Sequence, residues 1–238
     1  MIKLIHGNFE DTKVDKKQFD IDLIIADPPD NIGLKYNGFN DKISDGDYER
    51  NIHRWLELMG KLTSGPIFFT FNEKWTALVE RTIDQLEIPI IQRIQWYYTF
   101  GQDQTRRGRY SLCYRPIYWL NSDYVIPESI KIPSQRQIKY KDKRASSNGK
   151  MPPNVWEFPR ICGTFKERRP WSPTQLNELL VERIIKGHCR PGGLVLDPFI
   201  GSGTTAIICQ KFGVNCIGIE TSKETIKHTA EFLGVQYE

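Results

Sequence analysis

The sequence predicts an α/β fold built on a doubly wound, mostly parallel sheet, and three observations support this prediction. Short apolar runs alternate with segments whose apolar side chains recur every three or four residues, which is the strand and helix order of such sheets. The run 21–26 is nearly all apolar, as expected of a central strand that is covered on both faces. The same alternation resumes after Pro170. At 238 residues, the chain has room for one large domain with an insertion.

The elements follow from the N terminus in alternating order, with one change of pattern in the middle. The expected strands are 2–5, 21–26, 66–71, 94–100, 116–121, 194–196 and 216–219. The expected helices are 47–62, 73–86, 174–186, 203–212 and 222–233. Between the two aromatic strands and Pro170 lies a polar, lysine-rich stretch, 139–150, which has no apolar period and is predicted to be a loop.

The charge is unevenly distributed along the chain. Residues 93–170 carry 16 Lys and Arg against 6 Asp and Glu, whereas the remainder carries 17 against 23. The middle of the chain is therefore a basic insert in an acidic body, which is typical of a protein that binds a polyphosphate partner. A solvated loop region is the alternative interpretation of the same charge.

Composition excludes several classes of protein. No apolar run approaches the roughly 18 residues of a membrane span, and the N-terminal stretch does not resemble a signal peptide. We therefore expect a soluble, cytoplasmic protein without a membrane partner. The five cysteines include no C-x-x-C pair, so neither a disulfide framework nor a metal site is expected.

A glycine-rich loop follows the expected strand 194–196. Gly201 and Gly203 let the backbone turn sharply beside a helix start, whose N–H groups can approach a ligand. The loop is not a phosphate-binding P-loop, because no Lys precedes Thr204. Glu220 ends the next strand, 19 residues after Gly201, where a carboxylate usually binds a ribose diol. These features predict an adenosine-type cofactor.

A stiff acidic corner, Asp27-Pro28-Pro29-Asp30, directly follows the strand 21–26. Proline fixes φ near −65°, and the residue before each proline is restricted as well, so the corner is rigid. The sequence Asp-Pro-Pro can simply terminate a strand, or it can hold acceptor groups at fixed positions.

Two motifs together resemble those of a known enzyme family. Asp27-Pro28-Pro29 and Asp197-Pro198-Phe199-x-Gly201-x-Gly203-Thr204-Thr205 resemble the signature motifs of amino-group DNA methyltransferases, which methylate adenine N6 or cytosine N4. The order of the motifs, with the catalytic motif first and the cofactor loop last, is similar to that of the β class. The further matching stretches are Asn31-Ile32-Gly33-x-Lys35-Tyr36, Asn154-Val155-Trp156-Glu157, and Pro173-Thr174-Gln175 at the start of a helix.

The resemblance implies a circularly permuted, seven-stranded, Rossmann-like methyltransferase sheet. Residues 1–92 would form its catalytic half, 93–168 a target-recognition insert and 169–238 its cofactor-binding half. The resemblance also implies S-adenosylmethionine as the cofactor and duplex DNA as the partner, with the target base flipped out of the helix, and it allows a homodimer.

The resemblance assigns roles to three groups of residues. The expected catalytic residues are Asp27, Pro28, Pro29 and Asp30. The expected cofactor-binding residues are Asn8, Phe9, Asp27, Thr174, Asp197, Pro198, Phe199, Gly201, Ser202, Gly203, Thr204, Thr205 and Glu220. The expected DNA-binding residues are Lys35, Tyr36, Arg106, Arg107, Arg109, Lys139, Lys141, Lys143 and Arg144.

The chemistry of amino-group methylation accounts for the acidic corner. An exocyclic amino nitrogen is a poor nucleophile because its lone pair is delocalised into the ring. The carboxylate of Asp27 and the carbonyl of Pro28 can accept its two hydrogens, which favours the pyramidal, more nucleophilic nitrogen.

The sequence departs from the family pattern at three places. The fourth residue of the catalytic motif is normally aromatic and stacks on the flipped base, but here it is Asp30, which we expect to be an exposed carboxylate that repels phosphate. A ring could then come from Tyr36, Phe39, Trp55 or Trp96. Asn8 stands where the family commonly has Asp, and Leu176-Asn177 replaces a frequent Lys-Pro pair.

Several functions remain open at this stage. Asp27 favours adenine N6, because the cytosine-N4 enzymes more often have Ser at this position, and cytosine N4 is the alternative. A DNA-binding protein that lost catalysis through Asp30 is a hypothesis of another class. An RNA or nucleotide substrate is a third.

Overall fold

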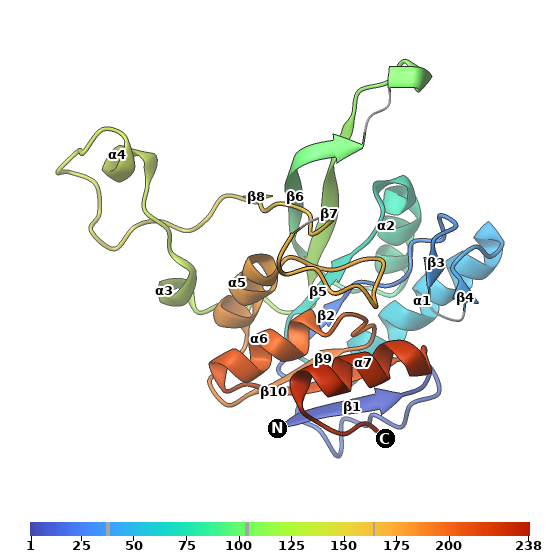
Figure 1. Cartoon of the computed structure of the whole chain (residues 1–238). Helices are drawn as coiled ribbons and strands as arrows, with labels where there is room; N and C mark the ends of the chain where they lie inside the picture. Colours follow the sequence, from blue (N-terminus) through green and yellow to red (C-terminus); the bar gives the residue numbers. More distant parts are fainter. Residues whose placement is uncertain (37–38, 103–104, 164) are drawn as a thin grey trace.

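The computed structural model describes residues 1–36, 39–102, 105–163 and 165–238. In the described residues, the centre is one eight-stranded sheet with the order β1-β10-β9-β2-β5-β7-β6-β8 (Figure 1). In this order the strands are Ile2–His6, Asn215–Glu220, Leu194–Asp197, Leu23–Ala26, Ile67–Thr70, Leu112–Leu120, Ile90–Gln102 and Val155–Glu157. β7 runs antiparallel to both of its neighbours, and the other described pairings in this sheet are parallel. The predicted α/β fold with a mostly parallel sheet is confirmed.

The two ends of the chain interleave in this sheet. β1 pairs with β10 from the C-terminal part, and β9 from the same part pairs with β2. This interleaving is the permuted order that the motifs indicate. The described sheet has one strand more than the expected seven, because the short β8 adds to the outer edge of β6.

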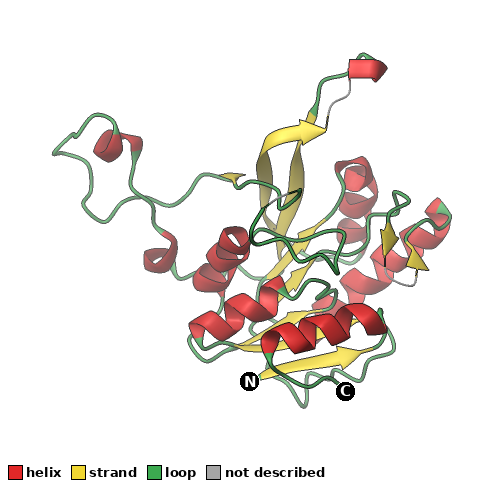
Figure 2. Cartoon of the chain, viewed as in Figure 1, coloured by secondary structure: helices red, strands yellow, loops and turns green. Residues whose placement is uncertain are grey.

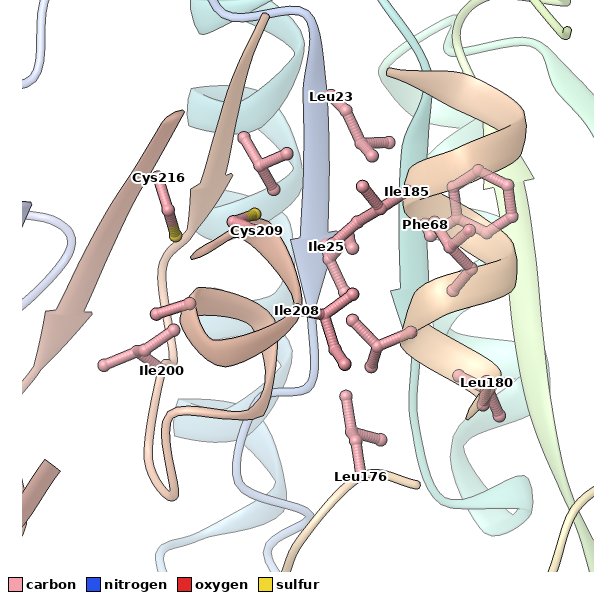
Figure 3. Packing of buried hydrophobic residues seen from close by; sticks show 14 of the residues in the cluster. Leu23, Ile25, Phe68, Leu176, Leu180, Ile185, Ile200, Ile208, Cys209 and Cys216 are labelled. Carbon is pink, nitrogen blue, oxygen red and sulfur yellow. The ribbon is translucent and has the colours of Figure 1, made fainter. Parts of the chain in front are cut away.

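Helices cover both faces of the sheet, as expected of a doubly wound fold (Figure 2). Side chains of β2 alternate between two cores: Leu23 and Ile25 pack into one, whereas Ile24 and Ala26 pack into the other. The first core includes side chains of α5 (Glu178–His188), α6 (Thr204–Phe212) and α7 (Lys223–Leu233), and Figure 3 shows part of it. The second core includes side chains of α1 (Asp45–Leu62) and α2 (Thr76–Gln85). Both faces of the central strand are therefore buried.

One expected helix starts later than the sequence predicted. The helix expected at 174–186 is α5, which begins at Glu178 because the side chain of Asn177 accepts hydrogen bonds from the N–H groups of Leu179 and Leu180. Pro173-Thr174-Gln175, expected at the start of the helix, therefore lies in the preceding loop. As part of a loop, this stretch can line a cavity.

The basic middle of the chain shares the central sheet instead of forming a separate body. β6, β7 and β8 lie within 93–168 or overlap it, and all three are strands of the main sheet. Two parts project from the sheet: the far end of the β6–β7 hairpin, which carries the 3-10 turn η2 (Thr105–Arg107), and the loop around α4 (Gln135–Ile138) (Figure 1). The remaining described elements are α3 (Pro127–Ile130), the turn η1 (Glu73–Trp75) and a two-stranded sheet of β3 (Lys35–Tyr36) and β4 (Phe39–Asn40). Among the described helices, none has the length and apolar character needed to cross a bilayer.

Candidate active site

Two neighbouring parallel strands each lead into an Asp-Pro pair at the same edge of the sheet. Asp27 follows β2, and Asp197 is the last residue of β9, which pairs with β2. Ligands of open α/β sheets bind outside the carboxyl ends of the strands. The two aspartates therefore mark the edge at which a site is expected, and two adjoining cavities lie there.

The first cavity gathers the residues that the sequence assigned to the cofactor. Of that set, Gly203 does not line it, while every other member does. These residues are Asn8, Phe9, Asp27, Thr174, Asp197, Pro198, Phe199, Gly201, Ser202, Thr204, Thr205 and Glu220. Residues distant in the sequence thus meet in one cavity, hereafter the cofactor cavity.

Gly203 lies behind the wall of the cofactor cavity and does not line the cavity itself. It is the N-cap of α6 and has a φ of +82°, a conformation that side chains rarely adopt. A Cβ at this position would lie 2.6 Å from Cγ2 of Thr229, whose hydroxyl donates to the carbonyl of Gly201 at 2.8 Å. The glycine therefore allows α7 to pack closely against the loop.

Two carboxylates of the cofactor cavity are held by neutral donors. Asp197 accepts hydrogen bonds from the hydroxyl of Thr205 at 2.5 Å and from the N–H of Phe199 at 3.0 Å, and burial raises its pKa to about 7. Glu220 accepts from the N–H groups of Ser222 and Gly201 at 2.7 and 3.1 Å, and burial raises its pKa as well.

The donor set of this cavity fits a cationic cofactor of the adenosine type. Three carboxylates, Asp27, Asp197 and Glu220, line it together with the apolar side chains of Phe199 and Ile219. None of the described residues that line it is Lys or Arg. A phosphate-bearing nucleotide would find no positive partner there, whereas a sulfonium such as that of S-adenosylmethionine would find negative ones.

The second cavity has a volume of about 490 Å³ and adjoins the first. Five residues line both: Asp27, Tyr36, Pro173, Thr174 and Leu176. The second cavity is also lined by Pro28, Asp30 and Arg115 and by the aromatic side chains of Trp96, Tyr98 and Tyr114. Because aromatic side chains and Asp27 line it together, we call it the substrate cavity.

Asp30 is buried, which corrects the expectation of an exposed carboxylate that repels phosphate. Its Oδ2 and Oδ1 accept hydrogen bonds from Nη1 and Nη2 of Arg115 at 2.7 and 3.0 Å, and Oδ1 also accepts from the N–H of Asn72 at 2.9 Å. The indole of Trp75 donates to the Asp30 carbonyl at 2.7 Å. The charge of Asp30 is thus compensated inside the protein.

Arg115 joins both acidic residues of the corner, and sequence reasoning missed it. Its Nη2 lies 2.6 Å from Oδ1 of Asp27, and its Nε donates to the hydroxyl of Thr70 at 2.9 Å. Burial alone would lower the pKa of Arg115, but the two carboxylates hold this pKa well above its usual value. A charged residue in the aromatic segment before the strand expected at 116–121 was the available signal, because β7 begins at Leu112 and includes it.

The oxygen atoms of residues 27–30 differ in whether they already accept a hydrogen bond from the protein. The carbonyl of Pro29 accepts from the hydroxyl of Tyr48 at 2.9 Å, and that of Asp30 accepts from Trp75. In the described part of the chain, no hydrogen bond is made to Oδ2 of Asp27 or to the carbonyl of Pro28. Burial raises the pKa of Asp27, and the Arg115 guanidinium opposes this shift.

The residues that could supply an aromatic ring for base stacking lie in different places. Tyr36 and Trp96 line the substrate cavity. Trp55 does not line it, and its indole donates to Glu10 at 3.0 Å. The side chain of Phe39 lies outside the described residues.

The predicted DNA-binding residues are not gathered in one place. Lys35 and Tyr36 form β3 beside the cavities. The other two groups are exposed on the two projections, the first at the far end of the β6–β7 hairpin and the second on the α4 loop (Figure 1). They are Arg106, Arg107 and Arg109, and then Lys139, Lys141, Lys143 and Arg144; Arg144 pairs with Asp142 at 3.0 Å.

Comparison with known proteins identifies the family. The DNA methylase family model, of the N6 and N4 type, matches residues 21–231. The chain belongs to the DNA methylase family. Two of its relatives are M.HpaI, a type II methyltransferase of Haemophilus parainfluenzae, and the DNA adenine methyltransferase YhdJ of Escherichia coli K12. Both are 34% identical to it, and the matches cover 91% and 87% of this chain and 69% and 74% of the relatives.

Solved structures of other DNA methylases share the fold. The cytosine-N4-specific PvuII DNA methyltransferase has a TM-score of 0.72 at 15% identity, with 96% of this chain and 85% of that chain covered. The complex of M1.HpyAVI with SAM has a TM-score of 0.64 at 22% identity, with 98% and 100% covered. Membership of the family confirms the expected activity, which is methyl transfer to DNA with S-adenosylmethionine as the cofactor.

Proposed function

We propose that this DNA methylase transfers a methyl group from S-adenosylmethionine to the exocyclic N6 of an adenine that has been flipped out of duplex DNA. The observation that carries the proposal is the place of Asp27, which lines both the cofactor cavity and the substrate cavity. An acceptor at the junction of the two cavities can hold an amino group where it meets a methyl donor.

The chain's own groups would orient the amino nitrogen. Oδ2 of Asp27 and the carbonyl of Pro28 accept no hydrogen bond from the described chain, so both can accept one from the amino group. Their separation is fixed by the two prolines and by Arg115, which holds the other oxygen of Asp27 at 2.6 Å. When bound, S-adenosylmethionine supplies an electrophilic methyl group on a positively charged sulfur. The protein therefore contributes orientation and negative potential.

The cofactor would be held by the residues of its cavity. Glu220, at the end of β10, is placed to accept from a ribose diol, and Asn8 and Phe199 would contact the adenine end. Asp197 and Asp27 would face the sulfonium end. Thr174 and Leu176 lie between the two cavities, because Pro173-Thr174-Gln175 precedes α5.

DNA would be held by the basic projections and would deliver its base to the substrate cavity. The exposed arginines of the β6–β7 hairpin and the lysines of the α4 loop would contact phosphates on either side of the target. An amino group inside the duplex cannot reach Asp27, so the base must leave the stack, at a cost of about a few kcal/mol. On this assignment, 93–168 recognises the target, while 1–92 and 169–238 form the catalytic and cofactor-binding halves.

The environment of Asp30 argues against the impaired alternative. That hypothesis rested on an unpaired carboxylate in the place of a ring, but the side chain of Asp30 is 10% exposed and is paired with Arg115. The fourth residue of the corner is therefore rigid and paired with a cation, and its environment gives no reason to expect a loss of catalysis.

Adenine N6 is favoured over cytosine N4 by Asp27 and by the similarity to YhdJ, which is named a DNA adenine methyltransferase. Incubation of unmethylated DNA with the protein and cofactor, followed by mass spectrometry of the nucleosides, tests this assignment. We expect N6-methyladenine, and it should form far more slowly with Asp27→Ala. N4-methylcytosine without N6-methyladenine would establish the cytosine alternative, and transfer to RNA alone would exclude DNA as the substrate.

A further inference from the structure

The ion pair of Asp30 and Arg115 has a geometry that goes beyond charge compensation. Nη1 and Nη2 of Arg115 donate to the two oxygens of Asp30 at 2.7 and 3.0 Å, which is the end-on, bidentate arrangement. Such a pair is planar, because the guanidinium and the carboxylate are each planar and share two hydrogen bonds. The two side chains therefore form one extended flat group.

The edges of this flat group are occupied by the protein. Four of the five N–H groups of Arg115 are used: one by Thr70, two by Asp30 and one by Asp27. Oδ1 of Asp30 also accepts from the backbone of Asn72. A ligand that enters the cavity therefore has little access to the hydrogen-bonding edges, and the face of the pair is what remains.

The exposed part of the pair belongs to the substrate cavity. The side chains of Asp30 and Arg115 are 10% and 13% exposed, and both line the substrate cavity next to Asp27 and Pro28. The plane is also rigid, since the hydroxyl of Thr70 is itself fixed by donating to the carbonyl of Pro116 at 2.9 Å. A rigid plane loses little conformational entropy when a ligand packs against it.

We propose that the planar Asp30–Arg115 pair is the surface on which the flipped base stacks. Bases stack on arginine guanidinium planes as they do on aromatic rings. A base stacked there has its amino group near Asp27, to which the same guanidinium is hydrogen-bonded. This inference rests on the proposed function and adds a base-binding residue, Arg115, to it.

Replacement of Arg115 by Lys separates the planar surface from the positive charge. Lysine keeps a cation beside Asp27, but it is not planar and cannot form the bidentate pair. We expect Arg115→Lys to lower kcat/KM for DNA about tenfold or more, with cofactor affinity changed less than about twofold. The acid limb of the pH profile should stay in place, because the charge next to Asp27 is kept. The assay is methyl transfer from labelled cofactor to unmethylated genomic DNA.

Two further variants complete the test. Arg93→Lys is the matched control, because Arg93 pairs with Glu80 at 2.8 Å outside both cavities, and its kcat/KM should change less than about twofold. Asp30→Asn keeps the size of the side chain, leaves Arg115 anchored by Asp27 and Thr70, and breaks the bidentate pair. We expect Asp30→Asn to raise KM for DNA by about threefold or more. This variant still tests the proposal if Arg115→Lys does not fold.

The outcomes distinguish this inference from the proposed function. Wild-type protein that transfers no methyl group would overturn both. An active wild type with an equally active Arg115→Lys or Asp30→Asn variant would overturn the stacking surface alone. A loss in Arg115→Lys that comes only from a shifted acid limb would also overturn it, because Arg115 would then act on the charge of Asp27.

Discussion

The carboxyl ends of β2 and β9 carry the same short motif in two different electrostatic settings. Both strands lead into an Asp-Pro pair, and both aspartates line the cofactor cavity. Asp27 has a cationic partner, since Arg115 reaches it from β7 across the end of β5. Asp197 is hydrogen-bonded to Thr205 and Phe199, which are neutral donors, and its pKa is raised to about 7.

A buried carboxylate can thus be stabilised by an ion pair within the protein, or it can be left with neutral donors until a cationic ligand binds. Asp27 shares the Arg115 guanidinium with Asp30, so its position is fixed before any ligand arrives. Among the described residues, no ion pair is formed by Asp197 or Glu220. A positively charged cofactor would complete their environment, as a paired charge costs much less to bury than an isolated one. We therefore expect substitutions at Asp27 to affect the chemical step and substitutions at Asp197 to affect cofactor binding.

The largest expected effect is at Asp27. Asp27→Ala removes one of the two acceptors for the amino group and leaves Arg115 without one of its partners. We expect kcat to fall by about 10²- to 10³-fold or more, which is typical when one transition-state contact is lost. Single-turnover methyl transfer measures it. Asp197→Asn is the comparison: it should change KM for the cofactor more than kcat, and the reverse pattern would break the distinction between the two strands.

The next effect concerns the glycine at the start of α6. Gly203→Ala introduces strain at a φ of +82° and brings a Cβ within 2.6 Å of Thr229. We expect a loss of about 1–3 kcal/mol in the free energy of unfolding, together with weaker cofactor binding. Gly213→Ala, at the other end of the same helix, is the control, because its φ is +65° but nothing lies within 4 Å of the added Cβ. Equal losses of stability in the two variants, measured by denaturant unfolding, would remove the role given to the Thr229 contact.

The basic projections should affect affinity more than catalysis. Replacement of Arg106, Arg107 and Arg109 by Ala should weaken DNA binding and reduce the slope of log K against log salt by about 0.9 for each phosphate contact that is lost. The same experiment on Lys139, Lys141 and Lys143 tests the α4 loop. Fluorescence anisotropy with duplex DNA at several salt concentrations gives both the DNA affinity and the slope of its salt dependence. An unchanged slope in both triple variants would show that neither projection lies on the DNA.

The smallest expected effect is a pH dependence of cofactor binding. Because the pKa of Asp197 is raised to about 7, its ionised fraction grows between pH 6 and pH 8. A sulfonium favours the ionised form, so S-adenosylmethionine should bind more tightly as the pH rises, by up to about tenfold, and should release protons. S-adenosylhomocysteine, which lacks the charge, and the variant Asp197→Asn should both show a weaker dependence in calorimetry. A steeper dependence for S-adenosylhomocysteine would contradict the assignment of Asp197 to the sulfonium end.

The raised pKa of Asp197 also has a consequence for stability. The folded protein holds this proton to a higher pH than the unfolded chain, whose carboxyl titrates near 3.8. The contribution of Asp197 to the free energy of unfolding is therefore present below pH 3.8 and decreases as the pH rises from about 4 to 7. Asp197→Asn should flatten this part of the stability profile of the cofactor-free protein.

Most of the residues that the sequence assigned to the cofactor share one cavity, because the signals for them are local. Asp197, Gly201 and Glu220 each follow or end a strand, and the parallel sheet brings strand ends to one edge. Gly203 was expected as a contact, but it lies behind the cavity wall, since its role depends on a close approach of α7 that no short motif specifies.

The substrate cavity was less predictable because it depends on pairings across the sheet. Arg115 lies 85 residues from Asp30, and only the antiparallel placement of β7 brings the two together. Because Arg115 was not identified from the sequence, Asp30 was predicted to be an exposed charge. The start of α5 was also misplaced, because Asn177 caps the helix after Pro173-Thr174-Gln175 and leaves that stretch as cavity wall.

Methylation of adenine in DNA at the Asp27 corner can be tested in living cells. Sequencing of modified bases in a host that expresses the protein, against hosts that express Asp27→Ala or an empty vector, tests it most directly. We predict N6-methyladenine at one short recurring sequence in the first host, a much lower level with Asp27→Ala and none with the empty vector. Unmodified adenine in all three hosts, or equal methylation with Asp27→Ala, would contradict a catalytic role of this corner in adenine methylation.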